Sequence, residues 1–125
     1  MPSVVVVDDN TTVLKLFKRA TENLALDLHT FSSADASMEF LKENKPQILF
    51  LDIIMPEKDG LTFLQELRKL PLHRDTLVIM ITSKDYAQDR TVANELGALE
   101  FITKPMPLVS ITDIILKYIN KDHPY

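Results

Sequence analysis

The sequence predicts an α/β fold in which five parallel strands form one sheet with helices on both faces. Short, wholly apolar runs such as Val4–Val7 and Ile48–Leu51 are typical of strands that are covered on both faces. Between such runs the apolar residues recur at helical spacing, and the two patterns alternate along the chain. Strict alternation of strand and helix indicates parallel strands that are joined by right-handed crossovers.

The first half of the chain is expected to hold strands at Val4–Val7 and Leu26–Phe31, each followed by a helix. Asn10 or a neighbouring threonine can cap the first helix, and Ser32–Ser33 can cap the second. Leu14 lies off the apolar stripe of the first helix and is expected to be exposed. The apolar residues expected to face the core are Val13, Leu16, Phe17, Ala20 and Leu24 in the first helix, and Ala36, Phe40 and Leu41 in the second.

The second half repeats the pattern, with strands expected at Ile48–Leu51, Leu77–Ile81 and Leu99–Ile102. Residues 55–60 have turn composition, and the third helix is expected to stop near Pro71. The fourth helix is expected to end at Gly97, as a C′ glycine. The stripes expected to face the core are Leu61, Phe63, Leu64 and Leu67 in the third helix, Ala87, Val92, Ala93 and Leu96 in the fourth, and Leu108, Ile111, Ile115 and Tyr118 or Ile119 in the fifth.

Composition limits the function. The 125 residues fit a single domain spanning 1–125, with an ordered core over about residues 3–121 and a tail at 122–125. There is no cysteine, which excludes disulfides and thiolate metal sites. The net charge is −4 without a basic cluster, which argues against direct nucleic-acid binding. No apolar run approaches the length of a membrane span, so a cytoplasmic protein without membrane contact is expected.

Polar groups follow four of the apolar runs: Asp8 and Asp9, then Asp52, Thr82 and Lys104. Ligands of such sheets bind beyond the carboxyl ends of the strands, where these groups would meet. Three clustered carboxylates repel each other and favour a shared hard cation, for which Mg²⁺ is the natural choice and Mn²⁺ an alternative. An aspartate can also be a nucleophile toward phosphorus, with an ammonium and a hydroxyl holding the phosphoryl group.

Each of these groups also has an ordinary interpretation. Asp8 and Asp9 can simply cap a helix, and Asp52 can be a turn residue at a strand end. Thr82 can be a common strand threonine, and Lys104 a solvated surface lysine. The four strand ends taken together favour the phosphoryl site over these separate interpretations.

The chain resembles the receiver domain of two-component response regulators over essentially its full length. The matching pieces are Val4–Val7 with Asp8–Asp9, residues 51–56 with Asp59–Gly60, residues 81–83, Gly97–Ala98 and Lys104–Pro105. The resemblance implies the flavodoxin-like receiver fold with strand order 2-1-3-4-5. It also implies a signalling phosphoacceptor, which catalyses only its own phosphorylation and dephosphorylation, rather than an enzyme with a separate substrate.

Carried onto this sequence, the resemblance makes Asp52 the phosphoacceptor and assigns the metal to Asp8, Asp9, Asp52 and the backbone carbonyl of Ile54. Thr82 and Lys104 would hold the phosphoryl group, Phe101 would be the aromatic switch, and the bond before Pro105 would be cis. The side chains of Ile54 and Lys84 lie where receivers vary and would tune dephosphorylation, with Ile54 slowing it. Ser83 stands where the family often has alanine.

The implied partner is a sensor histidine kinase or a histidine phosphotransfer protein, which passes a phosphoryl group to Asp52. Phosphorylation would then change the face made by the fourth helix, fifth strand and fifth helix, altering binding of a downstream protein or formation of a homodimer. An apolar rim for a docking partner helix is expected from Val13, Leu14, Met106 and Pro107.

Other interpretations stay open from the sequence. The chain can be a stand-alone receiver or the N-terminal receiver of a longer regulator. An aspartyl-nucleophile phosphohydrolase is less favoured because Ile54 replaces the second aspartate of the haloacid dehalogenase type. A nucleotide- or flavin-binding domain is disfavoured because Gly60 and Gly97 are the only glycines. A degenerate module that is never phosphorylated is least favoured.

Overall fold

A computed structural model describes residues 1–119 and contains one parallel sheet of five strands in the order β2-β1-β3-β4-β5. The expectation of strand order 2-1-3-4-5 is confirmed. The strands are β1 (Ser3–Val7), β2 (Asp27–Phe31), β3 (Ile48–Asp52), β4 (Val78–Thr82) and β5 (Glu100–Thr103). The helices are α1 (Thr11–Thr21), α2 (Ala34–Leu41), α3 (Gly60–Arg68), α4 (Ala87–Glu95) and α5 (Leu108–Ile119), with a 3₁₀ turn at Pro71–His73.

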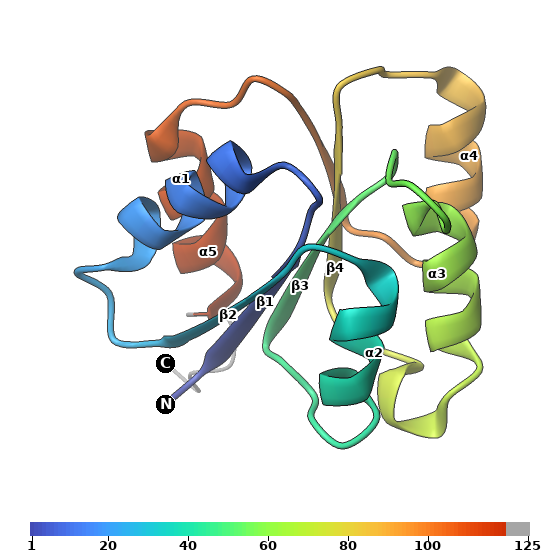
Figure 1. Ribbon diagram of the computed structural model, residues 1–125, viewed down its shortest axis with the longest axis horizontal. Helices are drawn as coiled ribbons and strands as arrows, with labels where there is room; N and C mark the ends of the chain where they lie inside the picture. Colours follow the sequence, from blue (N-terminus) through green and yellow to red (C-terminus); the bar gives the residue numbers. More distant parts are fainter. Residues whose placement is uncertain (120–125) are drawn as a thin grey trace.

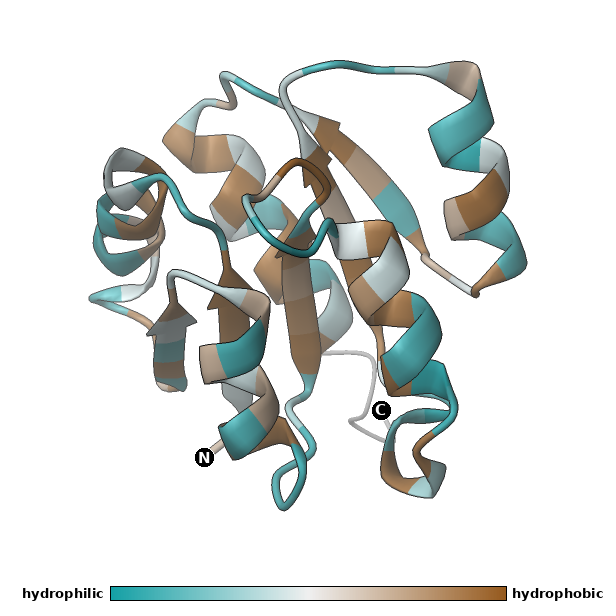
Figure 2. Ribbon diagram, turned by 45° about the vertical axis from the view of Figure 1, so that its right-hand side comes forward, coloured by the Kyte–Doolittle hydropathy of each residue, from teal (hydrophilic) through white to brown (hydrophobic). Residues whose placement is uncertain are grey.

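Helices cover both faces of the sheet. In Figure 1, α1 and α5 lie on one side of the strands, and α2, α3 and α4 lie on the other. Successive side chains of a strand point to opposite faces, so β1 divides between two cores. Val4 and Val6 pack with the residues of α1 and α5, whereas Val5 and Val7 pack with those of α2 and α3. The inner strands β1, β3 and β4 are accordingly apolar along most of their length, as Figure 2 shows, whereas the edge strands β2 and β5 also carry polar residues.

Local capping explains where the helices begin and end. The side chains of Asn10, Ser33 and Asp59 accept hydrogen bonds from backbone N–H groups in the first turns of α1, α2 and α3. Gly97 has φ of 81° directly after the C-cap of α4, as expected for a C′ glycine. These caps fix the loops that carry the functional groups.

Four expectations about exposure were wrong. Leu14 is buried, because α1 packs against both the sheet and α5 and therefore buries a wider face than one stripe. Ala36 is exposed, because the short helix α2 buries only a narrow face, which includes Ser37 in place of Ala36. The buried Ser37 hydroxyl is satisfied, since it donates to the carbonyl of Ala34 at 2.8 Å. Ala87 and Val92 are exposed, because α4 buries only Ala93 fully.

Several strand and helix ends differ from the expected positions by one or two residues. The expected tail at 122–125, and the end of the ordered core at 121, lie outside the described residues. No helix within residues 1–119 is both long and apolar enough to span a bilayer.

Candidate functional site

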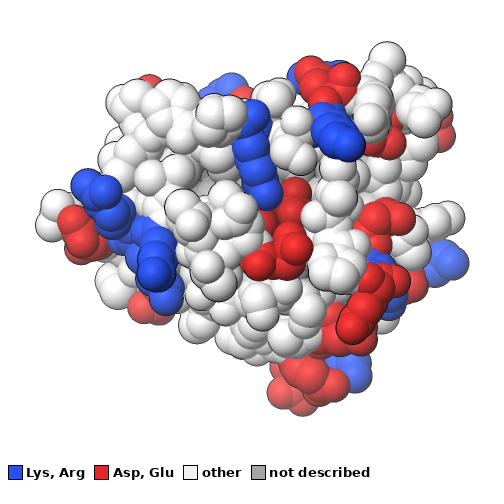
Figure 3. Space-filling model, turned by 45° about the horizontal axis from the view of Figure 1, so that its top comes forward, with Lys and Arg blue, Asp and Glu red and all other residues white. Residues whose placement is uncertain are grey.

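The carboxyl ends of four strands bring the predicted site residues together. Asp8 follows β1, Asp52 and Thr82 end β3 and β4, and Lys104 follows β5. One carboxylate oxygen from each of Asp8, Asp9 and Asp52 lies within 4.8 Å of the others. Figure 3 shows acidic side chains gathered near the middle of this face, with a basic side chain beside them.

The acidic cluster combines two buried carboxylates with one exposed carboxylate. The side chains of Asp8 and Asp52 are 0% and 2% exposed, whereas Asp9 is exposed. The N–H of Asn10 donates to Asp8 Oδ1 at 2.9 Å. Asp8 Oδ2 accepts no hydrogen bond from the described residues, although Lys104 Nζ lies 2.9 Å from it as an ion pair.

Within residues 1–119, one lysine faces these carboxylates. Lys104 Nζ lies 2.9 Å from Asp8 and 3.5 Å from Asp52 Oδ1. The pKa of Asp52 is raised from 3.8 to about 7, mainly by burial and next by the negative charge of Asp8. The positive charge of Lys104 lowers this pKa, and the charge of Asp9 raises it further. The site therefore has more negative charge than its own cation can neutralise.

These residues fit a hard divalent cation. The donors are all carboxylate oxygens, and the buried Asp8 Oδ2 has the Lys104 ammonium as a charged partner but accepts no hydrogen bond from the described residues. Two of the three carboxylates are held rigidly at strand ends, and Asp9 is open to solvent, which gives an ion a path of entry. The chemistry of the cluster thus agrees with a Mg²⁺ or Mn²⁺ site.

Thr82 is held by the loop that follows it. Its hydroxyl donates to the carbonyl of Lys84 at 2.7 Å and accepts from the N–H of Lys84 at 3.0 Å. The side chain is fully buried at the end of β4. The Lys104–Pro105 peptide bond is cis, as expected.

Gly60 lets the loop after β3 approach Asp52 closely. A Cβ atom at this position would lie 2.1 Å from the backbone oxygen of Asp52, a distance that no side chain tolerates. The N–H of Gly60 also donates to the carbonyl of Ile53 at 2.7 Å. Glycine is therefore required here by close backbone contact.

Sequence reasoning missed Arg90 and Asp85, which lie next to Phe101, the residue predicted to be the switch. Phe101, in β5, is partly buried, and the Arg90 guanidinium carbon lies 4.6 Å from the centroid of its ring. Arg90 also pairs with Asp85 in the loop between β4 and α4. A spacing of five residues across a loop and a helix start gives no periodic signal that would have revealed this pair.

The apolar docking rim was expected from residues that are largely buried. Val13, Leu14 and Met106 are each less than 10% exposed, and only Pro107 is exposed. A groove of about 240 Å³ nevertheless opens beside Lys104, between the start of α1 and the loop before α5. Its lining residues are Asn10, Thr12, Val13, Leu16, Lys104, Pro105 and Met106.

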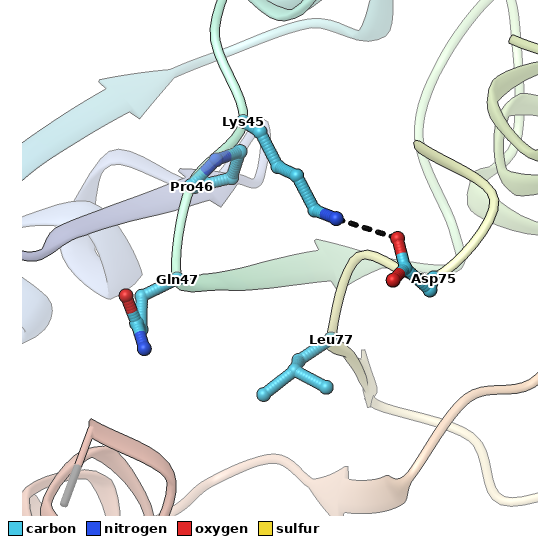
Figure 4. Close-up of a pocket in the computed structure, with 5 residues that line it drawn as sticks. All are labelled: Lys45, Pro46, Gln47, Asp75 and Leu77. Atoms are coloured by element: carbon cyan, nitrogen blue, oxygen red, sulfur yellow. Dashed lines mark hydrogen bonds and ion pairs between the residues drawn. The ribbon is translucent and has the colours of Figure 1, made fainter. Parts of the chain in front are cut away.

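A second hollow, of about 320 Å³, lies at the amino-terminal ends of β3 and β4, opposite to the acidic site. Figure 4 shows its lining residues, which are Lys45, Pro46, Gln47, Asp75 and Leu77. Lys45 Nζ pairs with Asp75 Oδ1 at 2.5 Å, and this bond lowers the pKa of Asp75. The two charges that line this hollow, Lys45 and Asp75, thus neutralise each other, whereas the acidic site has an excess of negative charge.

A family model described as the response regulator receiver domain matches residues 4–116 of the chain. Among curated proteins, the chain is 32% identical over 106 residues to the cyclic di-GMP phosphodiesterase response regulator RpfG of Xanthomonas campestris pv. campestris, covering 83% of this chain and 28% of RpfG. It is 31% identical over 102 residues to the transcriptional regulatory protein SrrA of Staphylococcus aureus, covering 82% of this chain and 41% of SrrA. The chain thus spans less than half the length of these relatives.

Among solved structures, the phosphorylated cyanobacterial phytochrome response regulator RcpA superposes with a TM-score of 0.87. The sequence identity is 20%, and the match covers 99% of each chain. This likeness confirms the expected fold.

Proposed function

The chain belongs to the response regulator receiver domain family, and we propose that Asp52 is its phosphoacceptor. The observation that carries the proposal is the position of Asp52, which is buried between the carboxylate of Asp8 and the ammonium of Lys104 at the end of β3. The phosphoryl donor is a phosphohistidine of a sensor kinase or a phosphotransfer protein.

In the reaction, a carboxylate oxygen of Asp52 forms a bond to phosphorus while the bond between phosphorus and the donor nitrogen breaks, and the electron pair leaves with the imidazole. Because burial raises the pKa of Asp52 to about 7, Lys104 has the role of favouring the charged nucleophile. Lys104 and Thr82 then hold the phosphoryl oxygens. Phosphoryl transfer needs little beyond such positioning and charge stabilisation.

A divalent cation, Mg²⁺ or Mn²⁺, would be held by Asp8, Asp9, Asp52 and the backbone carbonyl of Ile54. When bound, it neutralises charge on the transferring phosphoryl group. The support for this assignment is the cluster of three carboxylates, two of them buried, whose negative charge exceeds the single positive charge of Lys104.

The output is a population shift. To donate to a phosphoryl oxygen, the Thr82 hydroxyl must give up its bond to the carbonyl of Lys84. The movement of Thr82 vacates space for the ring of Phe101, and the surface made by α4, β5 and α5 changes its affinity for a downstream protein or for a second copy of the chain. The chain thus signals by catalysing only its own phosphorylation and dephosphorylation.

The lifetime of the phosphoryl group depends on side chains at the rim. Ile54 is 47% exposed beside the site, so its apolar side chain can shield the acyl phosphate from water. Lys84 is exposed two residues after Thr82 and is the second tuning position. Slow autodephosphorylation is the expected result.

The groove beside Lys104 is the proposed contact for the donor protein. It shares Val13 and Met106 with the rim that was expected, whereas Leu14 and Pro107 are not part of its lining. Thr12→Arg should fill the groove from an exposed position and slow transfer from a protein donor, but not from a small acyl phosphate. Thr11→Arg, at an exposed neighbour outside the lining, is the matched control, and equal rates for the two variants would contradict the docking assignment.

Intact mass after incubation with Mg²⁺ and a small acyl phosphate tests the whole proposal. A single phosphoryl adduct on the wild-type chain that is absent from Asp52→Asn supports it. Continuous turnover of organic phosphate esters would instead favour a phosphohydrolase. Absence of both would indicate a module that is never phosphorylated.

The wider setting is proposed from the family and from composition. A cytoplasmic location suits a partner of a sensor kinase. RpfG and SrrA are longer than this chain, so an output domain in a longer regulator and a separate target protein are both compatible with the receiver. With a net charge of −4, the receiver itself is not the part that would contact nucleic acid or an anionic membrane.

A further inference from the structure

Arg90 links three segments of the molecule through one guanidinium group. Its Nε lies 2.6 Å from Asp85 Oδ1, and its Nη2 lies 2.8 Å from Asp85 Oδ2, which is a bidentate pair. Its Cζ lies 4.6 Å from the centroid of the Phe101 ring, a distance typical of a cation–π contact. The loop after β4, the helix α4 and the strand β5 are thus joined at one point.

The loop that carries Asp85 is also attached to Thr82. The Thr82 hydroxyl and the backbone of Lys84 exchange two hydrogen bonds, and Asp85 is the next residue. A hydroxyl has one proton to donate, so Thr82 cannot bond to a phosphoryl oxygen while it donates to Lys84. A change of partner at Thr82 therefore releases the backbone directly beside Asp85.

Helix α4 has few other anchors near its beginning. Its N-cap residue, Tyr86, makes no capping bond through its side chain, and Ala93 is the one residue of the helix that is fully buried. The far end is held separately, because Arg68 Nε donates to the carbonyl of Leu96 at 2.8 Å. The contact of Arg90 with Phe101 is therefore a substantial part of what joins the first turns of α4 to β5.

We propose that Arg90 is a positioning residue for Phe101: paired with Asp85, it holds the ring in its half-exposed place while Thr82 is bonded to Lys84. The release of Phe101 when Thr82 turns toward a phosphoryl group rests on the proposed function. The flat guanidinium is essential to this role, because it pairs at its edge with a carboxylate and stacks with its face on a ring. A lysine keeps the positive charge but lacks this flat geometry, so it can replace the arginine only in part.

The test follows the ring itself, with 4-fluorophenylalanine placed at position 101 and observed by ¹⁹F NMR. Broadening by a neutral gadolinium chelate measures the fraction of molecules in which the ring is buried, without any phosphodonor. Arg90→Met should increase the ratio of buried to exposed ring about five-fold, which is the combined size of an exposed ion pair and a cation–π contact. Asp85→Asn and Arg90→Lys should each give a smaller increase.

Arg19→Met is the control, since Arg19 is an exposed arginine on α1, remote from β5. It should leave the ring unchanged, and urea unfolding should show similar global stability for all variants. A ring in Arg90→Met that is as exposed as in the wild type, or more exposed, would overturn the proposal.

The proposed function is judged by a separate measurement on the same samples. Intact mass after addition of Mg²⁺ and acetyl phosphate reports whether Asp52 is phosphorylated. If no adduct forms, the proposed function fails, while the ring measurement without donor still decides the role of Arg90. If the adduct forms and Arg90→Met leaves the ring unchanged, the proposed function stands and Arg90 loses its role.

Discussion

Asp52→Asn is expected to stabilise the metal-free protein at pH 8, even though it removes the proposed phosphoacceptor. Burial beside Asp8 raises the pKa of Asp52 from 3.8 to about 7, so the folded state holds this proton more tightly than the unfolded state does. At a pH between these two pKa values, the native protein binds more protons than the unfolded protein, so the free energy of unfolding falls as the pH rises. Above pH 7 the full penalty of a buried, charged Asp52 is present.

The size of the penalty follows from the two pKa values. The difference between 3.8 and about 7 corresponds to roughly 4 kcal/mol between the charged and neutral forms. Asparagine has a similar shape and no charge, so it should avoid most of this cost. For a domain of this size, each kcal/mol moves the melting temperature by about 3–5 °C, and the variant should melt about 10–15 °C higher than the wild type at pH 8.

Thermal unfolding followed by circular dichroism in EDTA, from pH 4 to pH 8, measures the effect. The advantage of Asp52→Asn should be near zero at pH 4 and should grow up to pH 7, and added Mg²⁺ should stabilise the wild type more than the variant. Asp27→Asn, at an exposed strand position, is the control and should show no such pH dependence. A variant that melts no higher than the wild type at pH 8, or an advantage independent of pH, would refute the reasoning.

Three further predictions concern the surroundings of the site. Gly60→Ala should lower the free energy of unfolding in urea by about 2 kcal/mol or more and should slow phosphorylation, because its Cβ would overlap the backbone oxygen of Asp52. The control is Gly97→Ala, at φ of 81°, which should be destabilising without slowing phosphorylation. Ile54→Asn should shorten the lifetime of the acyl phosphate about five-fold, measured by intact mass over time, since one hydrogen bond to an attacking water is worth about 1 kcal/mol; an unchanged lifetime would count against shielding. Arg68→Met should cost about 2 kcal/mol in urea unfolding, because three backbone carbonyls each lose a donor that lies within 2.9 Å, and full stability would show that water replaces it.

The sheet was predictable because each strand is covered on both faces and therefore carries a continuous apolar run. Val4–Val7 and Ile48–Leu51 fall within observed strands, and the strand ends place Asp52 and Thr82 at the expected edge. Strand order came from the family resemblance, since apolar runs carry no information about which neighbours pair. The fold brings Asp8 and Lys104, which are far apart in the sequence, to the same edge of the sheet, where Lys104 Nζ lies 2.9 Å from Asp8 Oδ2.

The helices were less predictable, because the exposure of a helix residue depends on what packs against it. Leu14 is buried by α5, an element far along the chain, and Val92 is exposed because α4 presents only a narrow face to the sheet. The pairing of Arg90 with Asp85 depends on the path of a loop, which the apolar pattern does not record. Errors of this kind concentrate around α4, the helix with the weakest apolar pattern.

The charges of the site also indicate why one lysine is not enough. Lys104 is nearer to Asp8 than to Asp52, so in the unphosphorylated protein it serves mainly the carboxylate that is completely buried. A phosphoryl group on Asp52 would carry more negative charge than the carboxylate it replaces and would draw the ammonium toward its oxygens. Asp8 would then be a buried anion without a cation, and leaving a buried charge unpaired costs several kcal/mol. Lys104 can therefore follow the phosphoryl group only if a second cation stays beside Asp8, which is a reason for three carboxylates at a site where the described residues supply one paired lysine.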